Sequence, residues 1–441
     1  MASLPQAHLF SLILLSLTSF SISQTPLIHP NALVLPLTKH ASTLQYVTII
    51  SQRTPLVPLN VIVDLGGQFL WVGCGSNYVS SSYRPAQCHS SQCFLAHGPK
   101  SCDHCLSRGR PKCNNGTCIL FSENVFTSKV SAGDLSEDVL SLQSTDGLNP
   151  RSAVAIPHFL FSCAPEVLLQ GLAGGAEGIA GLGHGRIGLP TLLSSALNFT
   201  RKFAVCLPPT TTSSGVIFFG DGPYALLPGI DVSKLLIYTP LIKNPRSVAT
   251  RVYVTEPLPS YEYFIRVKSI QINGKQVPLD SSLLAINKNG IGGTKISTVN
   301  PYTLLQTSIY NSFTKLFLQE AMAHNDTRVS PVAPFDVCFS TKNTNGAFST
   351  PAIPVIDLVL QNKKVFWRIF ETNSMVLVGD DVACLGFLDG GLNQRTSIVI
   401  GGHQLEDNLL QFDLESSRLG FTSSLLLRET SCANFNFTSS L

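Results

Sequence analysis

Short apolar segments, separated by Gly, Pro, Asn and Ser, recur along most of the chain. They are rich in Val, Ile, Leu and Phe, which is typical of buried and half-buried β-strands. The pattern predicts strands at residues 44–50, 57–63, 68–72, 216–219, 264–272 and 355–359.

Two segments favour helices instead. Residues 190–197 start with Pro190, which suits the first turn of a helix. Residues 301–324 carry apolar side chains at nearly helical spacing, at Leu305, Ile309, Phe313, Leu316 and Phe317. With few helices among many strands, we expect a mainly β protein.

Two distant parts of the chain repeat one arrangement. The predicted strand 57–63 leads Asp64 into a glycine turn, and an apolar pair followed by glycine comes later, at 178–183. Residues 293–299 and 399–402 repeat this order. Since 441 residues also exceed the usual single core, two related lobes are predicted. The expected lobes are residues 24–241, with a cysteine-rich insertion, and residues 242–441.

The first residues, 1–23, have the pattern of a signal peptide. The apolar run from Leu9 to Ile22 is shorter than the roughly 20 residues that a membrane span needs. Ser23 is a small residue suited to cleavage before Gln24. No later run is long and apolar enough to cross a bilayer. We therefore expect a secreted, extracellular protein without a membrane partner.

The cysteines agree with secretion, because an even number in a secreted chain indicates disulfides. The alternative for Cys102-x-x-Cys105 is a zinc site, which secretion disfavours, so no metal is expected. N-glycosylation sequons lie at Asn115, Asn198, Asn325 and Asn436. The 12 cysteines are Cys74, Cys88, Cys93, Cys102, Cys105, Cys113, Cys118, Cys163, Cys206, Cys338, Cys384 and Cys432.

Composition excludes several functional classes. A net charge of +3 with only 13% charged residues argues against nucleic acid as a partner. The chain has neither a Gly-x-Ser-x-Gly elbow nor a phosphate-binding glycine loop with lysine, so no serine hydrolase and no cofactor are expected. His184 and His403 follow glycine-rich turns and are interpreted as structural histidines.

Asp64 has the position of a catalytic acid, but its counterpart in the repeat is Ser297. Hydrolysis by a carboxylate dyad needs two acids that share one proton. Because serine cannot supply the second acid, the sequence predicts a protein that is not an enzyme. Asp64 is then a relict carboxylate, held by neighbouring backbone amides and ionised at neutral pH.

The chain resembles the two-lobed pepsin-like aspartic proteases, with lobes of the double-psi β-barrel type and a few short helices. More narrowly, it resembles plant homologues without activity: the xylanase inhibitors, the extracellular dermal glycoproteins and the basic 7S globulins. The residues that carry the resemblance are 64–74, the cysteines at 88–118, 398–407 and 412–421.

The chain departs from active members of that fold at several places besides Ser297. Leu65 replaces a hydroxyl residue that bonds across the two catalytic loops, and Val299 replaces a glycine. Residues 121–135 lack the Tyr-Gly-Asp-Gly-Ser type of flap. Several losses together indicate release from catalysis.

The resemblance also implies disulfides and partner contacts. It implies the pairs Cys338–Cys384 and Cys206–Cys432. In the resembling inhibitors a side chain before the last cysteine enters the target enzyme, and Arg428, with Glu429, lies there. The second contact loop carries an arginine in endoglucanase-inhibiting relatives. Here that loop offers Lys342 and Phe348.

Three functions follow as alternatives. The first is a secreted inhibitor of microbial cell-wall glycoside hydrolases, a xyloglucan-specific endoglucanase or a xylanase of a pathogen, acting in plant defence. The second is a storage protein, or a protein that binds a peptide or cell-wall carbohydrate, as the 7S globulins imply. The third is a weak aspartic protease that uses Asp64 and some other acid.

Overall fold

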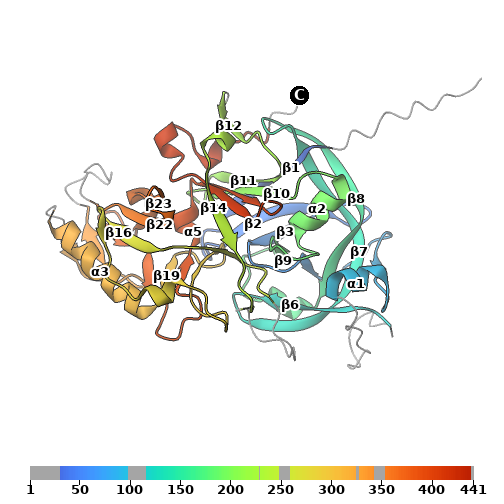
Figure 1. Cartoon of the computed structure of the whole chain (residues 1–441). Coiled ribbons are helices and arrows are strands. Elements are labelled where there is room, and N and C mark those ends of the chain that lie inside the picture. The colour runs from blue at the N-terminus through green and yellow to red at the C-terminus, as the bar shows by residue number, and fades with distance from the viewer. Residues whose placement is uncertain are drawn as a thin grey trace, which may run out of the picture.

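The structure is a computed structural model that describes residues 30–97, 116–227, 229–247, 259–323, 327–341 and 353–438. It is a mainly β protein of two lobes, as predicted, with α1 (Ser91–His97) and α3 (Thr307–Met322) at its outer edges (Figure 1). Within these ranges a 19-stranded sheet includes strands from both lobes, and three smaller sheets complete the β-structure.

The first half of the chain contains strands β1 to β13 and two helices. Its strands are β1 (Ala32–Lys39), β2 (Tyr46–Gln52), β3 (Val57–Asp64), β4 (Trp71–Gly73), β5 (Arg84–Pro85), β6 (Ile119–Asn124), β7 (Lys129–Thr145), β8 (Pro150–Ala164), β9 (Ala176–Gly181), β10 (Lys202–Cys206), β11 (Ser214–Gly220), β12 (Ala225–Leu227) and β13 (Ile230–Asp231). Its helices are α1 (Ser91–His97) and α2 (Leu189–Leu197).

The second half contains strands β14 to β29 and three helices. Its strands are β14 (Ile237–Ile242), β15 (Tyr263–Ile265), β16 (Ser269–Ile272), β17 (Lys275–Gln276), β18 (Thr294–Ile296), β19 (Thr303–Leu305), β20 (Arg328–Val329), β21 (Cys338–Ser340), β22 (Ile356–Asn362), β23 (Val365–Ile369), β24 (Met375–Leu377), β25 (Val382–Leu385), β26 (Phe387–Asp389), β27 (Ile398–Ile400), β28 (Leu409–Asp413) and β29 (Arg418–Phe421). Its helices are α3 (Thr307–Met322), α4 (Glu371–Ser374) and α5 (Gly402–Leu405).

Each lobe has a strand that ends at the site between the lobes. In the first lobe β3 pairs in parallel with β9, and the pairing ends at Asp64 opposite Gly181. In the second lobe β18 pairs in parallel with β27, from Thr294–Ile398 to Ile296–Ile400. The repeat read from the sequence therefore corresponds to two similar strand pairs.

Three predicted elements were wrong in extent. Of the strand expected at 68–72, only the end is extended, as β4. The single strand expected at 264–272 is two strands, β15 and β16, because the chain leaves one sheet and joins another. In between, the Lys268 N–H donates to Val359 O at 2.7 Å. The helix expected from residue 301 begins only at Thr307. Residues 303–305 form β19 instead, since they pair with both β26 and β27.

Residues 121–135, which lack the flap motif, are nevertheless part of a hairpin. β6 and β7 form an antiparallel hairpin whose register runs from Ile119 opposite Asp134 to Asn124 opposite Lys129. The Trp71 Nε1–H donates to Glu123 O at 3.1 Å and fixes the hairpin to the first lobe. Backbone pairing maintains this hairpin although the sequence motif is missing.

The lobes are joined by strands and by a buried polar cluster. β10 pairs with β28, and the rings of Phe203 and Phe412 stack with centroids 4.7 Å apart. Beside this sheet, Glu406 receives hydrogen bonds from Lys39 Nζ at 2.6 Å and Tyr46 OH at 2.9 Å. The cluster ties β1 and β2 to the second lobe. The expected boundary at residue 241 falls within β14, and we keep it as a proposal.

Four disulfides lie within the described residues. They include the two pairs implied by the resemblance, Cys206–Cys432 and Cys338–Cys384. The other two are Cys74–Cys163 and Cys93–Cys118. Cys102, Cys105 and Cys113 lie outside the described ranges. Cys88, which precedes them in the sequence, is half-buried.

Candidate functional site

Asp64 ends β3 and is almost completely buried between the lobes. The Gly66 N–H donates to Asp64 Oδ1 at 2.8 Å. Gly67 follows in a tight turn, where a Cβ atom would lie only 2.7 Å from the Cα of Gly181. The glycine is therefore required by the close approach of the turn to the end of β9.

Ser297 follows β18, and its backbone N–H donates to Ile400 O of β27 at 2.9 Å, whereas the hydrogen bonds of its hydroxyl are local. Its hydroxyl donates to Asn300 Oδ1 at 3.3 Å and accepts from the Val299 N–H at 3.1 Å. Such bonds stabilise a turn, which is a common role of serine. They provide no second carboxyl group for Asp64.

A hydroxyl bridge across the two loops survives on one side. Thr298 Oγ1 donates to Val63 O at 2.8 Å and accepts from the Leu65 N–H at 3.1 Å. Leu65 is buried, and its side chain has no hydroxyl group that could form the equivalent hydrogen bonds to the second loop. Half of the cross-loop bonding expected in active relatives is thus present, and half is replaced by apolar packing.

Sequence reasoning missed a second carboxylate, Glu262, and its partner Lys295. β15 pairs with β18 with Tyr263 opposite Ile296, so Glu262 lies at the position across from Ser297. Glu262 Oε1 accepts from Lys295 Nζ at 2.5 Å. A Cβ placed on Gly66 would lie 3.5 Å from both Asp64 Oδ1 and Glu262 Oε1, so these oxygens are at most twice that distance apart.

The electrostatics of Asp64 follow from these neighbours. Burial raises the pKa of Asp64 to about 6, against the hydrogen bond from the Gly66 amide, which lowers it. The negative charge of Glu262 raises the pKa further and the Lys295 ammonium lowers it. One backbone amide donates to Asp64, and its carboxyl group remains mostly ionised at neutral pH. This state is close to the relict carboxylate that the sequence predicts.

This arrangement differs from an acid dyad. In a dyad two equivalent carboxyl groups share one proton in contact with a water molecule. Here Glu262 is engaged by an ammonium group and also accepts from Ser260 Oγ at 3.0 Å. The site therefore contains one buried carboxylate, Asp64, beside the ion pair of Glu262 and Lys295.

The predicted partner contact Arg428 lies on the surface, away from the buried acid. It closes a short 3-10 helix, Leu426–Arg428, and Glu429 follows in a left-handed conformation with φ 55°. Both side chains are exposed, as is Leu427 (63%). Lys342 and Phe348, the expected second contact, lie outside the described residues.

The Arg428 segment is held firmly from behind. The Arg428 and Thr430 N–H groups both donate to Leu425 O, at 2.8 and 3.3 Å. Ser431 Oγ donates to Asp407 Oδ1 at 2.9 Å, and Cys432 is bonded to Cys206. A fixed support of this kind reduces the entropy lost when an exposed side chain binds a partner.

The remaining predicted residues lie apart from these two sites. Asn198 and Asn436 are exposed, whereas Asn115 and Asn325 are outside the described ranges. His403 contacts Glu406 Oε2 at 3.2 Å and Met375 O at 2.9 Å through its ring nitrogens, as a structural histidine does. The ring centroids of His184 and Tyr263 are 5.8 Å apart.

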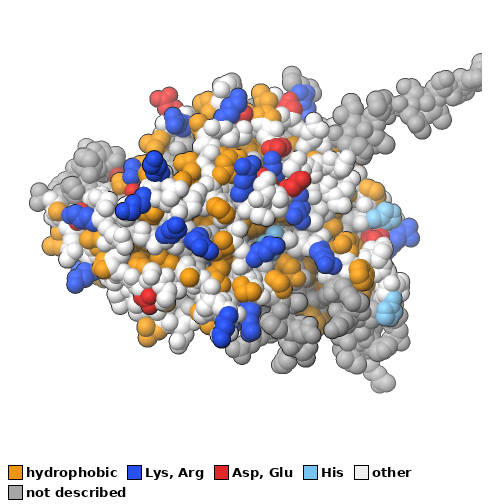
Figure 2. Space-filling model, in the orientation of Figure 1, with side chains coloured by type: hydrophobic (Ala, Val, Ile, Leu, Met, Phe, Trp, Pro, Cys, Tyr) orange, Lys and Arg blue, Asp and Glu red, His pale blue; other side chains and the backbone are white. Residues whose placement is uncertain are grey.

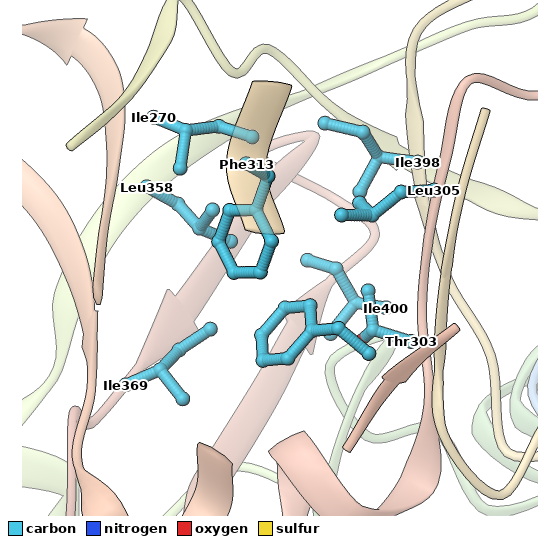
Figure 3. A pocket seen from close by; sticks show the side chains of 9 residues that line it. Ile270, Thr303, Leu305, Phe313, Leu358, Ile369, Ile398 and Ile400 are labelled. Atoms are coloured by element: carbon cyan, nitrogen blue, oxygen red, sulfur yellow. The ribbon is translucent and has the colours of Figure 1, made fainter. Parts of the chain in front are cut away.

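A small cavity in the second lobe is too small to be a ligand site (Figure 3). The space open to the centre of a water molecule is about 10 Å³, close to the minimum for one water. Its lining is apolar except for Thr303, whose hydroxyl donates to Gln404 Oε1 at 2.7 Å. The cavity is a packing gap among Ile270, Leu305, Phe313, Leu358, Ile369, Phe387, Ile398 and Ile400.

Among the residues that the structure describes, no group of His, Cys, Asp and Glu side chains has an arrangement suited to a metal ion. Within the same ranges, none of the helices has the length and apolar character of a membrane span.

Comparison with known proteins identifies the family. Family models described as xylanase inhibitor N-terminal and xylanase inhibitor C-terminal match residues 46–221 and 262–423. A probable aspartic proteinase, GIP2, of Nicotiana benthamiana is 55% identical, over 97% of this chain and 96% of the relative.

Solved structures agree with this assignment. The crystal structure of edgp has a TM-score of 0.89 at 56% identity and covers 93% of this chain and 99% of its own. Basic 7S globulin from soybean has a TM-score of 0.79 at 38% identity, covering 93% of this chain and 100% of its own. The chain therefore belongs to the xylanase-inhibitor family, whose two lobes have the pepsin-like aspartic protease fold.

Proposed function

We propose that the protein is a secreted inhibitor of microbial cell-wall glycoside hydrolases and has no protease activity of its own. The observation that supports this most directly is Arg428, exposed on a segment that a disulfide and buried hydrogen bonds hold in place. The match to the xylanase-inhibitor models gives the class of partner.

The proposed mechanism is competitive occupation of the partner's substrate groove. A retaining glycanase has two carboxylates about 5–5.5 Å apart. The planar guanidinium of Arg428 can bind carboxylates through paired, charge-assisted hydrogen bonds, which a lysine ammonium cannot do. Glu429 and Leu427 would contact the rim of the groove, with Lys342 and Phe348 in a second loop.

The test is a titration of the purified protein against xyloglucan-specific endoglucanases and xylanases from plant pathogens. We expect Arg428→Ala to weaken the inhibition constant about 10- to 100-fold, as for a central interface residue. Arg428→Lys should restore little of this loss. Arg328→Ala is the matched control, because Arg328 is also exposed and lies on β20. Absence of inhibition across the panel at micromolar concentration would contradict the proposal.

The lack of protease activity is proposed from Ser297 and from the engagement of Glu262 by Lys295. Glu262 is an acid close enough to Asp64 for weak proteolysis to be conceivable, so the alternative has a definite test. Peptide cleavage at pH 3–6 that Asp64→Asn and Glu262→Gln each abolish would establish it. We expect the wild-type protein to cleave peptides no faster than the double variant that combines Asp64→Asn and Glu262→Gln.

A storage role is the second candidate, because the chain is similar over most of its length to soybean basic 7S globulin. Accumulation of the protein in seeds, without inhibition of any glycanase, is the result that would favour this candidate over the first.

A further inference from the structure

One face of the molecule, over β14, carries many Lys and Arg side chains and few acidic ones (Figure 2). We define the basic face by five residues that come from both halves of the chain. Four of them are exposed and Arg201 is half-buried. None forms an ion pair with a described Asp or Glu, whereas Lys39 and Lys275 elsewhere do. The five residues are Arg186, Arg201, Lys243, Arg266 and Lys268.

Pairing of strands places the second-lobe residues of the basic face next to β14. β14 pairs with β15 with Leu241 opposite Ile265, so Arg266 follows directly beside that strand. Arg266 and Lys268 flank the buried Val267 and therefore point outward together. Lys268 Nζ donates to Gln361 O at 2.5 Å, and the Gln361 amide donates to Tyr238 O of β14 at 2.8 Å.

The other residues of the basic face gather around His184. The His184 N–H donates to Tyr261 O at 3.1 Å, which joins the lobes at this point. Burial lowers the pKa of His184, and the charges of Lys243 and Arg201 lower it further, as expected of cations nearby. Arg186 precedes α2. Burial raises the pKa of the Tyr261 hydroxyl, and the positive charge of Arg186 lowers it.

The charge of the basic face is not compensated locally. The five cations have no ion-pair partner among the described residues, and few acidic side chains lie on this face (Figure 2). Exposed cations without partners repel one another and attract anions. Because they are spread over strands and loops of both lobes, they suit an extended anion with repeated charges better than one compact anion.

We propose that the basic face binds an acidic polysaccharide, a chain of uronate sugars. Its carboxylates are spaced along a flexible chain, and exposed guanidinium and ammonium groups on long stems can follow them. Arg186 and Arg266 can each hold a carboxylate with two parallel hydrogen bonds. Binding of this kind would retain a secreted protein in an acidic matrix, independently of inhibition through Arg428.

The test measures binding of the full chain to immobilised polygalacturonate oligosaccharides over a series of salt concentrations. The site variant combines Arg186→Gln, Lys243→Gln and Arg266→Gln, which are exposed residues without a hydrogen bond or ion pair of their side chains in the described part. We expect wild-type binding that weakens steeply with salt, because exposed charges are screened within about 10 Å at 0.1 M. The site variant should bind at least tenfold more weakly.

The matched control removes the same charge elsewhere, through Lys129→Gln, Arg151→Gln and Lys275→Gln on β7, β8 and β17. The control should bind within about twofold of wild type. Equal losses in the two variants, equal binding to neutral xyloglucan, or binding to anionic vesicles without binding to polygalacturonate would each overturn the proposal. Unchanged thermal unfolding of the site variant shows that a loss of binding is not a loss of fold.

Discussion

The two loops that meet between the lobes have similar backbones and different chemistry. The Asp64 loop follows β3 and keeps its carboxylate, with one amide donor and a glycine turn against β9. The Ser297 loop follows β18 and has a hydroxyl that bonds only within its own turn. On the neighbouring strand, across from Ser297, Glu262 forms an ion pair with Lys295.

This difference separates what supports the fold from what supports catalysis. The strand pairs β3–β9 and β18–β27 are intact, and Thr298 still bridges the loops. A carboxylate at position 297 is therefore unnecessary for the fold, since backbone pairing and one threonine hold the loops together. The acid that remains is a cost to stability at neutral pH, because its charge is buried.

The largest expected effect comes from breaking the bridge between the loops. Thr298→Val leaves the Val63 carbonyl and the Leu65 N–H buried without their partner. Two buried backbone groups left unsatisfied should lower the free energy of unfolding by roughly 2–5 kcal/mol. Denaturant unfolding monitored by tryptophan fluorescence measures the change.

Thr294→Val is the matched control, since it removes the same hydroxyl from the adjoining strand. The Thr294 hydroxyl is buried and has no hydrogen-bond partner among the described residues. This substitution should be neutral or stabilising. If the two variants lose equal stability, the bridge does not hold the loops together.

The second effect is the part of the pH dependence of stability that comes from Asp64. Burial raises the pKa of Asp64 from an ordinary 3.8 to about 6, so the folded state holds this proton more tightly than the unfolded state. Stability from this group is fully present below about pH 4 and is lost as the pH rises to about 6, a change of up to about 3 kcal/mol. Asp64→Asn should abolish this slope and raise stability at pH 7.

Asp231→Asn gives the opposite sign and serves as the control. Burial alone would raise the pKa of Asp231, but hydrogen bonds from Ser233 and the Tyr224 amide outweigh it and lower the pKa. Its contribution is therefore present at neutral pH and is lost on acidification. An unchanged slope between pH 4 and 6 in Asp64→Asn would refute the assignment to Asp64.

Local sequence patterns predicted much of the first loop and little of the environment of the second. The apolar run before Asp64 and the glycines after it determine the loop within a few residues. Glu262 and Lys295 became neighbours of Asp64 only through the register of β15 against β18, which local periodicity does not reveal. The basic face escaped notice for the same reason, because its residues come from separate strands and loops.

The same limit explains the wrong helix start and the unexpected hairpin. Residues 303–305 are apolar enough to extend the helical pattern, but pairing with β26 and β27 gives them strand conformation. The hairpin of β6 and β7 depends on backbone pairing and on Trp71, so loss of a flap motif did not remove it. Long-range pairing overrides local preference in both cases.

The smallest expected effect comes from the Ser297 loop and tests whether that loop is independent of Asp64. Ser297→Ala removes two hydrogen bonds of 3.3 and 3.1 Å within one turn, so the free energy of unfolding should fall by only about 0.5–1 kcal/mol. The loss should be the same at pH 4 and pH 7, because a hydroxyl does not titrate in this range and contacts no charged group. Urea unfolding at both pH values measures it. A loss that depends on pH would mean that Ser297 senses the protonation of Asp64, and the two loops would then still form one coupled site.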